Sequence, residues 1–283
     1  MTSTNKMNES EIKALVTLLD DDDHEVVQHV ETRLRTLGGS IIPLLEDHWQ
    51  GNGLNPELQK KIEDLIHDLQ YNTVIDRLVA WKNAGHEDLL EGMWIVATYQ
   101  YPDLNIDKLR QYINDMYFDA WLELREDMHP HDQIRVLNQV FFDKYKYLPN
   151  TKNFHSVANS MLNQVFDLKK GNPISLCVIY MLFARRLGLP VSGVNLPSLF
   201  VLTYKTPQMQ FYINIFNRGL IFSKVDISNY IKQMQLKPQD SFFQPCSNLD
   251  IVSRVLRNLI VSFEKISDLE RAKEVESILK AIS

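Results

Sequence analysis

Apolar residues recur every three or four positions over most of the chain, and this spacing predicts a protein built mainly of helices. Residues 191–222 follow a different pattern, in which short apolar runs and alternation are typical of strands. The expected helices lie at 11–19, 26–37, 41–49, 56–69, 88–99, 106–125, 247–266 and 268–282. The last two would form a helical hairpin, which needs another surface to cover its apolar face.

One further helix is expected at the centre of the chain, after a loop at 170–172. Pro173 suits its first position, because no backbone N–H is needed there, and the run that follows is almost wholly apolar. Gly188 and Pro190 would end it. Ser175 and Cys177 then fall near the positive end of the helix dipole, which favours an anion or a thiolate.

Two strand-like segments follow this helix. Residues 191–204 are rich in Val, Leu and Phe and are interrupted by Pro197, and residues 210–222 carry Gly219 at an expected turn. Cysteine hydrolases and transglutaminases use a helix followed by antiparallel strands to bring a nucleophile, a base and an orienting carboxylate together. The predicted fold is therefore α+β, mostly helical, with a short antiparallel sheet.

Five segments carry a more specific signal when they are taken together. They are Asn159-Ser160, Lys170–Leu176, Ala184–Pro190, Gly193–Phe200 and Tyr212–Gly219. Over roughly residues 107–235 the chain resembles the transglutaminase-like superfamily, and within it the bacterial SirB-type family. The resemblance implies a papain-like core in which the helix that begins at Pro173 is the nucleophile helix.

The resemblance also implies that the catalytic triad is lost. The family's cysteine opens the nucleophile helix, where this chain has Pro173 and, as the nearest candidate side chain, Ser175. Leu199 stands at the place of the histidine, and Asn214 at the place of the carboxylate. A serine without a base is a poor nucleophile, and leucine cannot accept a proton. We therefore expect a protein that keeps the fold of this superfamily but does not catalyse its reaction.

Two candidates lie outside the matched positions. Cys177 points to another side of the helix than Ser175 and is expected to be a small buried thiol in the core. His155 lies just upstream of Asn159-Ser160 and could face the same cleft, but it precedes the nucleophile helix and is not the family's base. Cys246 is expected in a loop, and two cysteines give no disulfide framework, which fits a reducing cytoplasm.

Two motifs contain residue types that bind metal ions but lack the spacing or partners of a metal site. The acidic run Asp20–Asp23 lacks the ligand spacing of a calcium loop and is expected to cap a helix. His129 and His131 bracket a proline at a helix start and have no matching pair elsewhere, so we predict no metal and no cofactor.

Composition narrows the class of partner. The chain has 45% hydrophobic and 23% charged residues and a net charge of −6, which argues against nucleic acid or an anionic membrane as partner. No stretch approaches the ~18 apolar residues of a membrane span. Residues 1–10 are polar and lack the apolar segment of a signal peptide, so we expect a cytoplasmic protein.

The sequence predicts four parts without linkers, packed as one compact body. They are a HEAT-like helical region (1–70), a helical part leading into the core (71–150), the transglutaminase-like core (151–246) and a tetratricopeptide-like hairpin (247–283).

For the function, we expect a catalytically degenerate, regulatory module that binds a protein or peptide. The alternative is a thiol or serine acyl-transfer enzyme, a protease or transglutaminase-like enzyme, with a relocated catalytic set.

Overall fold

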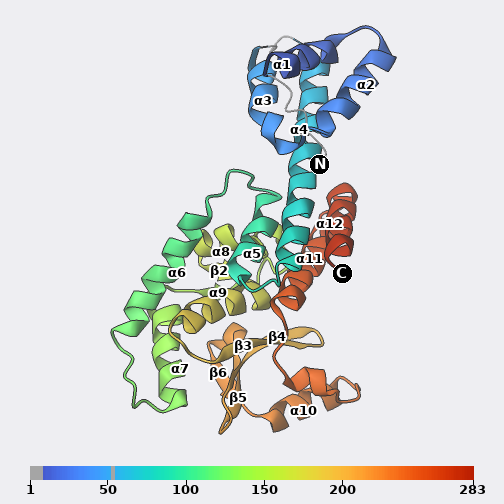
Figure 1. Ribbon diagram of the computed structural model, residues 1–283. Coiled ribbons are helices and arrows are strands. Elements are labelled where there is room, and N and C mark those ends of the chain that lie inside the picture. Colours follow the sequence, from blue (N-terminus) through green and yellow to red (C-terminus); the bar gives the residue numbers. More distant parts are fainter. Residues whose placement is uncertain (1–8, 52–54) are drawn as a thin grey trace. The chain divides into compact units, whose positions relative to one another are not determined.

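The computed structural model describes residues 9–51 and 55–283 and divides the chain into two compact units, residues 1–77 and 78–283 (Figure 1). The expectation of one compact body is therefore wrong. Each unit has a hydrophobic core of its own, so the absence of a flexible linker does not imply a shared core.

Residues 1–8, on which most of the expectation about a signal peptide rests, lie outside the described residues. The expected part boundaries after residues 70, 150 and 246 stay predictions.

The first unit is helical throughout its described residues. Its core is formed by apolar side chains that lie three or four positions apart, such as Val30 and Leu34 in one helix and Leu58 and Ile62 in another. The helices are α1 (Glu9–Thr17), α2 (His24–Arg35), α3 (Ile42–Gly51) and, up to residue 77, α4 (Pro56–Asn83), with short 3-10 turns η1 (Leu18–Asp20) and η2 (Gly38–Ile41). The four predicted helices are confirmed, α4 continuing to Asn83. The HEAT-like assignment stays a prediction.

The acidic run before α2 caps that helix, as predicted. The Asp23 carboxylate accepts a hydrogen bond from the Glu25 backbone N–H at 2.9 Å, and the Asp21 carboxylate accepts one from the Asp23 N–H at 2.9 Å. Asp20 accepts a hydrogen bond from the Asn55 side chain at 2.8 Å. Each of these contacts satisfies a donor of the protein itself, and Asp23 lies at the N-terminus of α2, where a negative charge is favoured.

The second unit combines helices with two small sheets. Its helices are α5 (Leu89–Thr98), α6 (Ile106–Trp121), α7 (Pro130–Asn138), α8 (Leu162–Leu168), α9 (Pro173–Arg186), α10 (Lys224–Gln233), α11 (Asn248–Lys265) and α12 (Leu269–Ile282). A π-helical segment, η3 (Gln139–Lys144), continues α7, and the 3-10 turns are η4 (Val157–Asn159), η5 (Ile215–Asn217) and η6 (Asp240–Phe243). The predicted α+β, mostly helical fold is confirmed. One helix, α6, ends at Trp121 rather than at the expected Arg125.

The central helix α9 is the buried helix that the sequence predicts. Asn172 caps it, Pro173 is its first residue, and Gly188 takes a φ of +75° just beyond its end. All side chains from Ile174 to Met181 are buried. A left-handed φ is readily adopted by glycine, which explains why the helix stops there.

The larger sheet is antiparallel, with the order β3-β4-β5-β6. Its strands are β3 (Val191–Leu196), β4 (Leu199–Lys205), β5 (Gln210–Asn214) and β6 (Leu220–Phe222), while β1 (Leu148–Pro149) and β2 (Lys170–Gly171) pair in parallel. Pro197 and Ser198 form the turn from β3 to β4, where Ser198 has a φ of +56°. One sheet face packs against Ile227 and Ile231 of α10, and α9 contacts β3 and β4.

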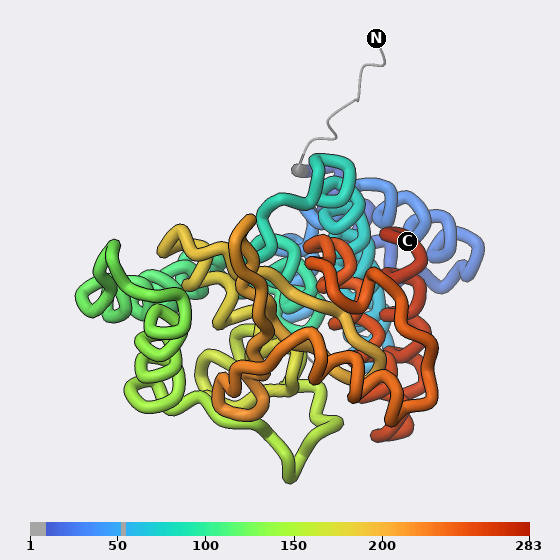
Figure 2. The backbone as a smooth tube through the Cα atoms, turned by 90° about the horizontal axis from the view of Figure 1, so that it is seen from below, coloured from blue at the N-terminus to red at the C-terminus, as the bar shows by residue number. Residues whose placement is uncertain are grey.

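The C-terminal helices form the predicted hairpin, and it docks within the second unit. Helix α11 contacts α5 and α9, and α11 is seen beside α5 in both Figure 1 and Figure 2. Ser247 caps α11 in a capping box with Asp250. The surface that the hairpin was expected to need is supplied in part by α5 and α9. The tetratricopeptide-like assignment stays a prediction. No helix in residues 9–51 and 55–283 is long and apolar enough to cross a membrane.

Candidate functional site

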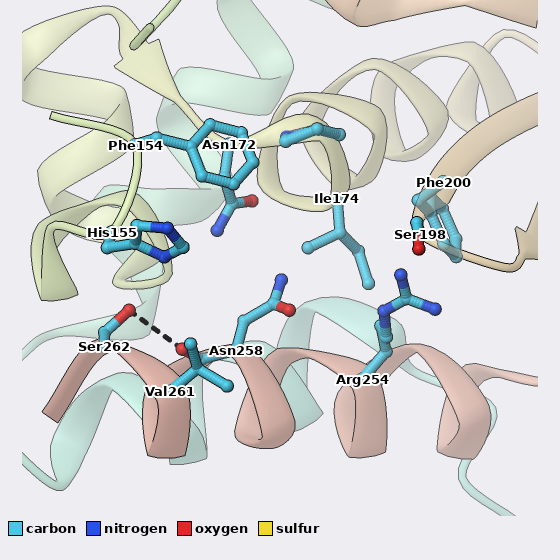
Figure 3. A pocket seen from close by; sticks show the side chains of 11 residues that line it. Phe154, His155, Asn172, Ile174, Ser198, Phe200, Arg254, Asn258, Val261 and Ser262 are labelled. Carbon is cyan, nitrogen blue, oxygen red and sulfur yellow. Dashed lines mark hydrogen bonds between the residues drawn. The ribbon is translucent and has the colours of Figure 1, made fainter. Parts of the chain in front are cut away.

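A pocket of about 140 Å³ lies at the N-terminal end of α9. Its walls come from the loop before η4, the first turn of α9, the β3–β4 turn and α11 (Figure 3). The lining residues are Phe154, His155, Asn172, Pro173, Ile174, Ser198, Phe200, Arg254, Asn258, Val261 and Ser262. The pocket therefore lies where the family resemblance expects a catalytic cysteine to open the helix.

Hydrogen bonds between side chains and backbone hold the first wall in place. The Asn172 Oδ1 accepts from the Ser175 N–H at 3.0 Å, and the Asn172 amide donates to the Ser160 Oγ at 3.1 Å. The Asn159 amide donates to the carbonyls of Asn153 and Phe154, at 2.8 and 2.9 Å. Asn159 and Ser160, which the resemblance singles out, thus position the helix cap and the loop that bears His155.

Helix α11 supplies the opposite wall. Arg254, Asn258, Val261 and Ser262 recur at helical spacing and therefore share one face of α11. Figure 3 shows the Arg254 guanidinium and the Asn258 amide pointing into the pocket. Arg254 Nη1 also donates to Asn195 Oδ1 at 2.7 Å, and more weakly to the Leu196 carbonyl at 3.4 Å. Burial lowers the pKa of the Arg254 guanidinium below its ordinary value, and the Arg257 charge lowers it further.

Ser175 is buried beneath the pocket and does not line it. Its hydroxyl donates to the Asn172 carbonyl at 3.2 Å, within the first turn of the helix. A Cβ atom at Gly171 would lie 2.5 Å from the Ser175 Oγ, so the Gly171 backbone covers the hydroxyl closely. The position nearest to the family's nucleophile is therefore enclosed by the protein's own backbone.

Leu199 and Asn214, at the positions of the base and the orienting carboxylate, also have structural surroundings. Leu199 packs, partly buried, against a hydrophobic cluster that includes Val201 and Tyr212. Asn214 ends β5, and its side chain accepts a hydrogen bond from the Asn217 N–H at 3.1 Å, which caps η5. Among the described residues, no hydrogen bond joins any two of the side chains of Ser175, Leu199 and Asn214, and none of the three lines the pocket.

Cys177 occupies the core position that its helix geometry predicts. It is fully buried, and its Sγ lies 3.7 Å from the Phe200 carbonyl. Burial raises the pKa of the Cys177 thiol well above its ordinary value, because a thiolate would be desolvated there. Cys246 is partly buried, and desolvation raises the pKa of its thiol to about 12. Both side chains are therefore neutral thiols near pH 7.

The histidines that the sequence analysis singled out lie in different surroundings. His155 is exposed, lines the pocket and meets the Phe154 ring edge-on at 5.2 Å between centroids. His129 caps α7 by accepting from the His131 N–H at 3.3 Å, and the His131 ring packs against Phe211. In the part of the chain that the structure describes, no three His, Cys, Asp or Glu side chains are grouped so as to hold a metal ion.

Sequence reasoning missed the residues that give the pocket its polar character, above all Arg254 and Asn258. The available signal was the polar stripe at positions 254, 258 and 262, which runs beside the apolar stripe of the same predicted helix. That stripe predicts a boundary between the buried and exposed faces of the helix. It does not identify the element that the boundary faces, here the start of α9.

Comparisons with known proteins identify the superfamily of the second unit's central part. Residues 107–257 match the transglutaminase-like superfamily. A UPF0162 protein of Xylella fastidiosa (strain 9a5c) is 28% identical over 206 residues, which cover 69% of this chain and 72% of that protein. A UPF0162 protein of Vibrio cholerae is 22% identical over 175 residues, or 60% of this chain and 64% of that protein.

A shorter match is found in mouse F-box only protein 21, which is 35% identical over 69 residues, 24% of this chain and 11% of that protein. No solved structure matches. The superfamily match covers more than half of the chain and includes α9, the sheet and the part of α11 that carries Arg254. By this match and by the helix and sheet that it covers, the chain belongs to the transglutaminase-like superfamily.

Proposed function

We propose that this protein is a catalytically degenerate member of the superfamily that binds a peptide segment of a partner protein, as a regulatory module of the cytoplasm. The observation that carries the proposal is the pocket at the start of α9. It combines hydrogen-bonding groups of Asn258 and Arg254 with exposed apolar surface of Phe154 and Val261. A peptide offers backbone N–H and C=O groups together with side chains, and it needs both kinds of partner.

The surroundings of the matched triad positions support the absence of catalysis. A general base must reach its proton at about 2.6–3.2 Å, and Leu199 has no group that accepts one. The Ser175 hydroxyl is already hydrogen-bonded to the Asn172 carbonyl. The raised pKa of the Cys177 thiol keeps that side chain protonated, and it is fully buried. None of these groups can attack an acyl substrate bound in the pocket.

One observation favours the alternative, an acyl-transfer enzyme with a relocated catalytic set. Ser198 and His155 both line the pocket, and Ser198 has a left-handed φ of +56°, as strained catalytic residues often do. However, Figure 3 shows the two side chains on opposite sides of the pocket, with Ile174 and Asn258 between them. A serine needs its base within hydrogen-bonding distance to become a nucleophile. We therefore favour binding over catalysis.

Turnover assays separate the two functions. Purified protein is incubated with p-nitrophenyl acetate and, separately, with a fluorescent primary amine and a glutamine-containing protein substrate. We expect the wild type to be no faster than Ser198→Ala and His155→Ala. Turnover that exceeds the blank and is lost in both variants would establish the relocated enzyme and overturn the degenerate one.

Photo-crosslinking tests the binding function. A pool of random hexapeptides with a photoreactive group is irradiated with the protein, and the adducts are mapped by mass spectrometry. We expect adducts on the pocket walls, including residues 154–155 and 254–262. Val261→Trp should abolish them, because Val261 lines the pocket and the larger ring would block it. Val261 is 40% exposed, so the ring can be accommodated at the rim without disturbing the core. Val225→Trp, on α10 at 66% exposure, is the matched control. Adducts that are insensitive to Val261→Trp would contradict binding at this site.

A further inference from the structure

Among the described residues, Arg254 is the one Lys, Arg, Asp or Glu side chain that lines the pocket. In the described part of the second unit, four exposed arginines are paired with carboxylates: Arg110 with Asp107, Arg135 with Asp132, Arg218 with Asp143 and Arg271 with Asp268. The partly buried Arg185, which does not line the pocket, has a carbonyl and a neutral amide as hydrogen-bond partners. The described residues give Arg254 no such ion pair, and its hydrogen bonds go to a neutral amide and a carbonyl. The pocket therefore contains a cation whose charge no nearby acid balances.

The surroundings of this cation favour an anion. Removing a guanidinium from water is costly unless a negative charge and hydrogen bonds compensate it. Arginine stays protonated even with a lowered pKa, so the charge persists at any ordinary pH. Only Nη1 is engaged by Asn195 and Leu196, whereas the guanidinium points into the pocket in Figure 3. The amide of Asn258 adds a neutral hydrogen-bonding group, and the N-terminus of the 14-residue helix α9 adds partial positive charge.

The size of the pocket and its apolar surface restrict the kind of anion. At about 140 Å³ the pocket is smaller than the ~300–1,000 Å³ that encloses a whole small-molecule ligand, so it suits the end of a longer chain. Phe154 and Val261, which are 44% and 40% exposed, give the pocket apolar surface, whereas Ile174 and Phe200 are almost fully buried in its wall. A carboxylate with an apolar side chain next to it matches both surfaces, and the last residue of a peptide presents that pair of groups.

We infer that the pocket binds the free C-terminal carboxylate of a peptide whose last side chain is apolar, with Arg254 pairing with the carboxylate. The inference rests on the proposed peptide-binding function and specifies which part of the peptide is recognised. A guanidinium forms charge-assisted, paired hydrogen bonds with a carboxylate that it cannot form with a neutral amide. The free acid and the amide of one peptide should therefore differ strongly in affinity.

Two fluorescent tetrapeptide pools test this inference by fluorescence anisotropy. Both are random at three positions and end in leucine, one as the free acid and the other as the C-terminal amide. We expect the acid pool to bind the wild type about tenfold to a hundredfold more tightly. Arg254→Gln should remove this preference. Arg257→Gln is the matched control, because Arg257 is exposed on the same helix and does not line the pocket.

Arg254→Gln also removes the contacts with Asn195 and Leu196 and could unfold the protein, so a second variant is used as a control. Asn258→Asp keeps the shape of the side chain and leaves Arg254 in place, but adds a negative charge beside it. We expect it to weaken binding of the acid pool about tenfold more than binding of the amide pool. Equal effects on both pools would show that the carboxylate is not what the pocket recognises.

The remaining outcomes distinguish this inference from the proposed function. Equal binding of the two pools, lost in Val261→Trp, would overturn the carboxylate inference and leave peptide binding intact. No binding of either pool, together with no crosslinked adducts, would overturn both. N-acetyl-leucine serves as a third probe. If it binds as tightly as the acid pool, the pocket recognises a free small carboxylic acid, and the inference of a peptide end is wrong.

Discussion

The hydroxyl of Tyr180 donates a hydrogen bond to Asn138 Oδ1 at 2.9 Å inside the second unit. The Asn138 amide in turn donates to the Gly219 carbonyl at 3.2 Å. Tyr180 is fully buried on α9, Asn138 ends α7, and Gly219 lies in the turn before β6. This polar connection joins the central helix to the far edge of the sheet, and it leaves no room for a side chain at Gly219.

We predict that Gly219→Ala destabilises the protein by about 2–4 kcal/mol, measured by urea unfolding. Gly219 has a φ of +72°, and a Cβ atom there would overlap the Asn138 side chain. Gly188→Ala is the matched control, because its φ is +75° and nothing lies within 4 Å of the added atom. The control should lose only about 1–2 kcal/mol, the cost of the left-handed backbone. Equal losses would mean that Asn138 moves away without cost.

We predict that Asn172→Ala costs about 1–2 kcal/mol, because it removes the N-cap of α9 and leaves the Ser160 hydroxyl without its donor. Asn172→Asp should lose less, since a carboxylate also accepts from the Ser175 N–H and is favoured at a helix N-terminus. Thermal unfolding of the three proteins gives the comparison. An Asp variant as unstable as the Ala variant would show that the amide donor to Ser160, which aspartate lacks, contributes more than the cap.

The raised pKa of the Cys177 thiol predicts a loss of stability at alkaline pH. The unfolded chain releases this proton near the ordinary thiol pKa of 9.0, whereas the folded chain holds it to a higher pH. Above about pH 9 the unfolded state therefore binds fewer protons, and stability falls with rising pH by up to about 1.4 kcal/mol per unit for one thiol.

Cys177→Ala should remove its share of this slope, measured by urea unfolding between pH 8 and 10. Cys246→Ala is the control for the second thiol, whose pKa is raised to about 12. The same burial predicts that maleimide at neutral pH leaves Cys177 unmodified in the native protein and labels it after unfolding. Rapid native labelling of Cys177 would contradict both expectations.

Much of the core could be predicted from the sequence because single residues determine its local geometry. Pro173 and Gly188 set the two ends of α9 through a missing N–H and a left-handed φ. Pro197 interrupts a strand-like run, and the structure has the β3–β4 turn there. These features depend on a few neighbouring residues, so no knowledge of the tertiary structure was needed.

The pocket could be predicted only in part, because its two walls come from distant parts of the chain. His155 was a candidate through its nearness to Asn159-Ser160, and it lines the pocket. Arg254 was not, because hydrophobic spacing shows which face of α11 is buried but not that α9 and β3 lie against it. The division into two units was missed for a related reason: periodicity predicts helices but not which of them share a core.

The last prediction concerns restoration of the triad by the variant Ser175→Cys/Leu199→His/Asn214→Asp. We expect it to be less stable than the wild type and to turn over ester and glutamine substrates no faster. A thiol at position 175 would be covered by the Gly171 backbone, outside the pocket. A histidine at position 199 would replace a leucine that packs against the hydrophobic cluster, at a cost of about 1–3 kcal/mol.

The single variant Asn214→Asp is the control for this experiment, since aspartate can still accept from the Asn217 N–H and cap η5. It should keep nearly all of the wild-type stability, so that the loss in the triple variant is traced to positions 175 and 199. A strong gain in turnover by the triple variant would mean that the three positions can still meet around a substrate. Catalysis would then have been lost through side-chain identity alone, and the enclosure of Ser175 by Gly171 would not be what prevents it.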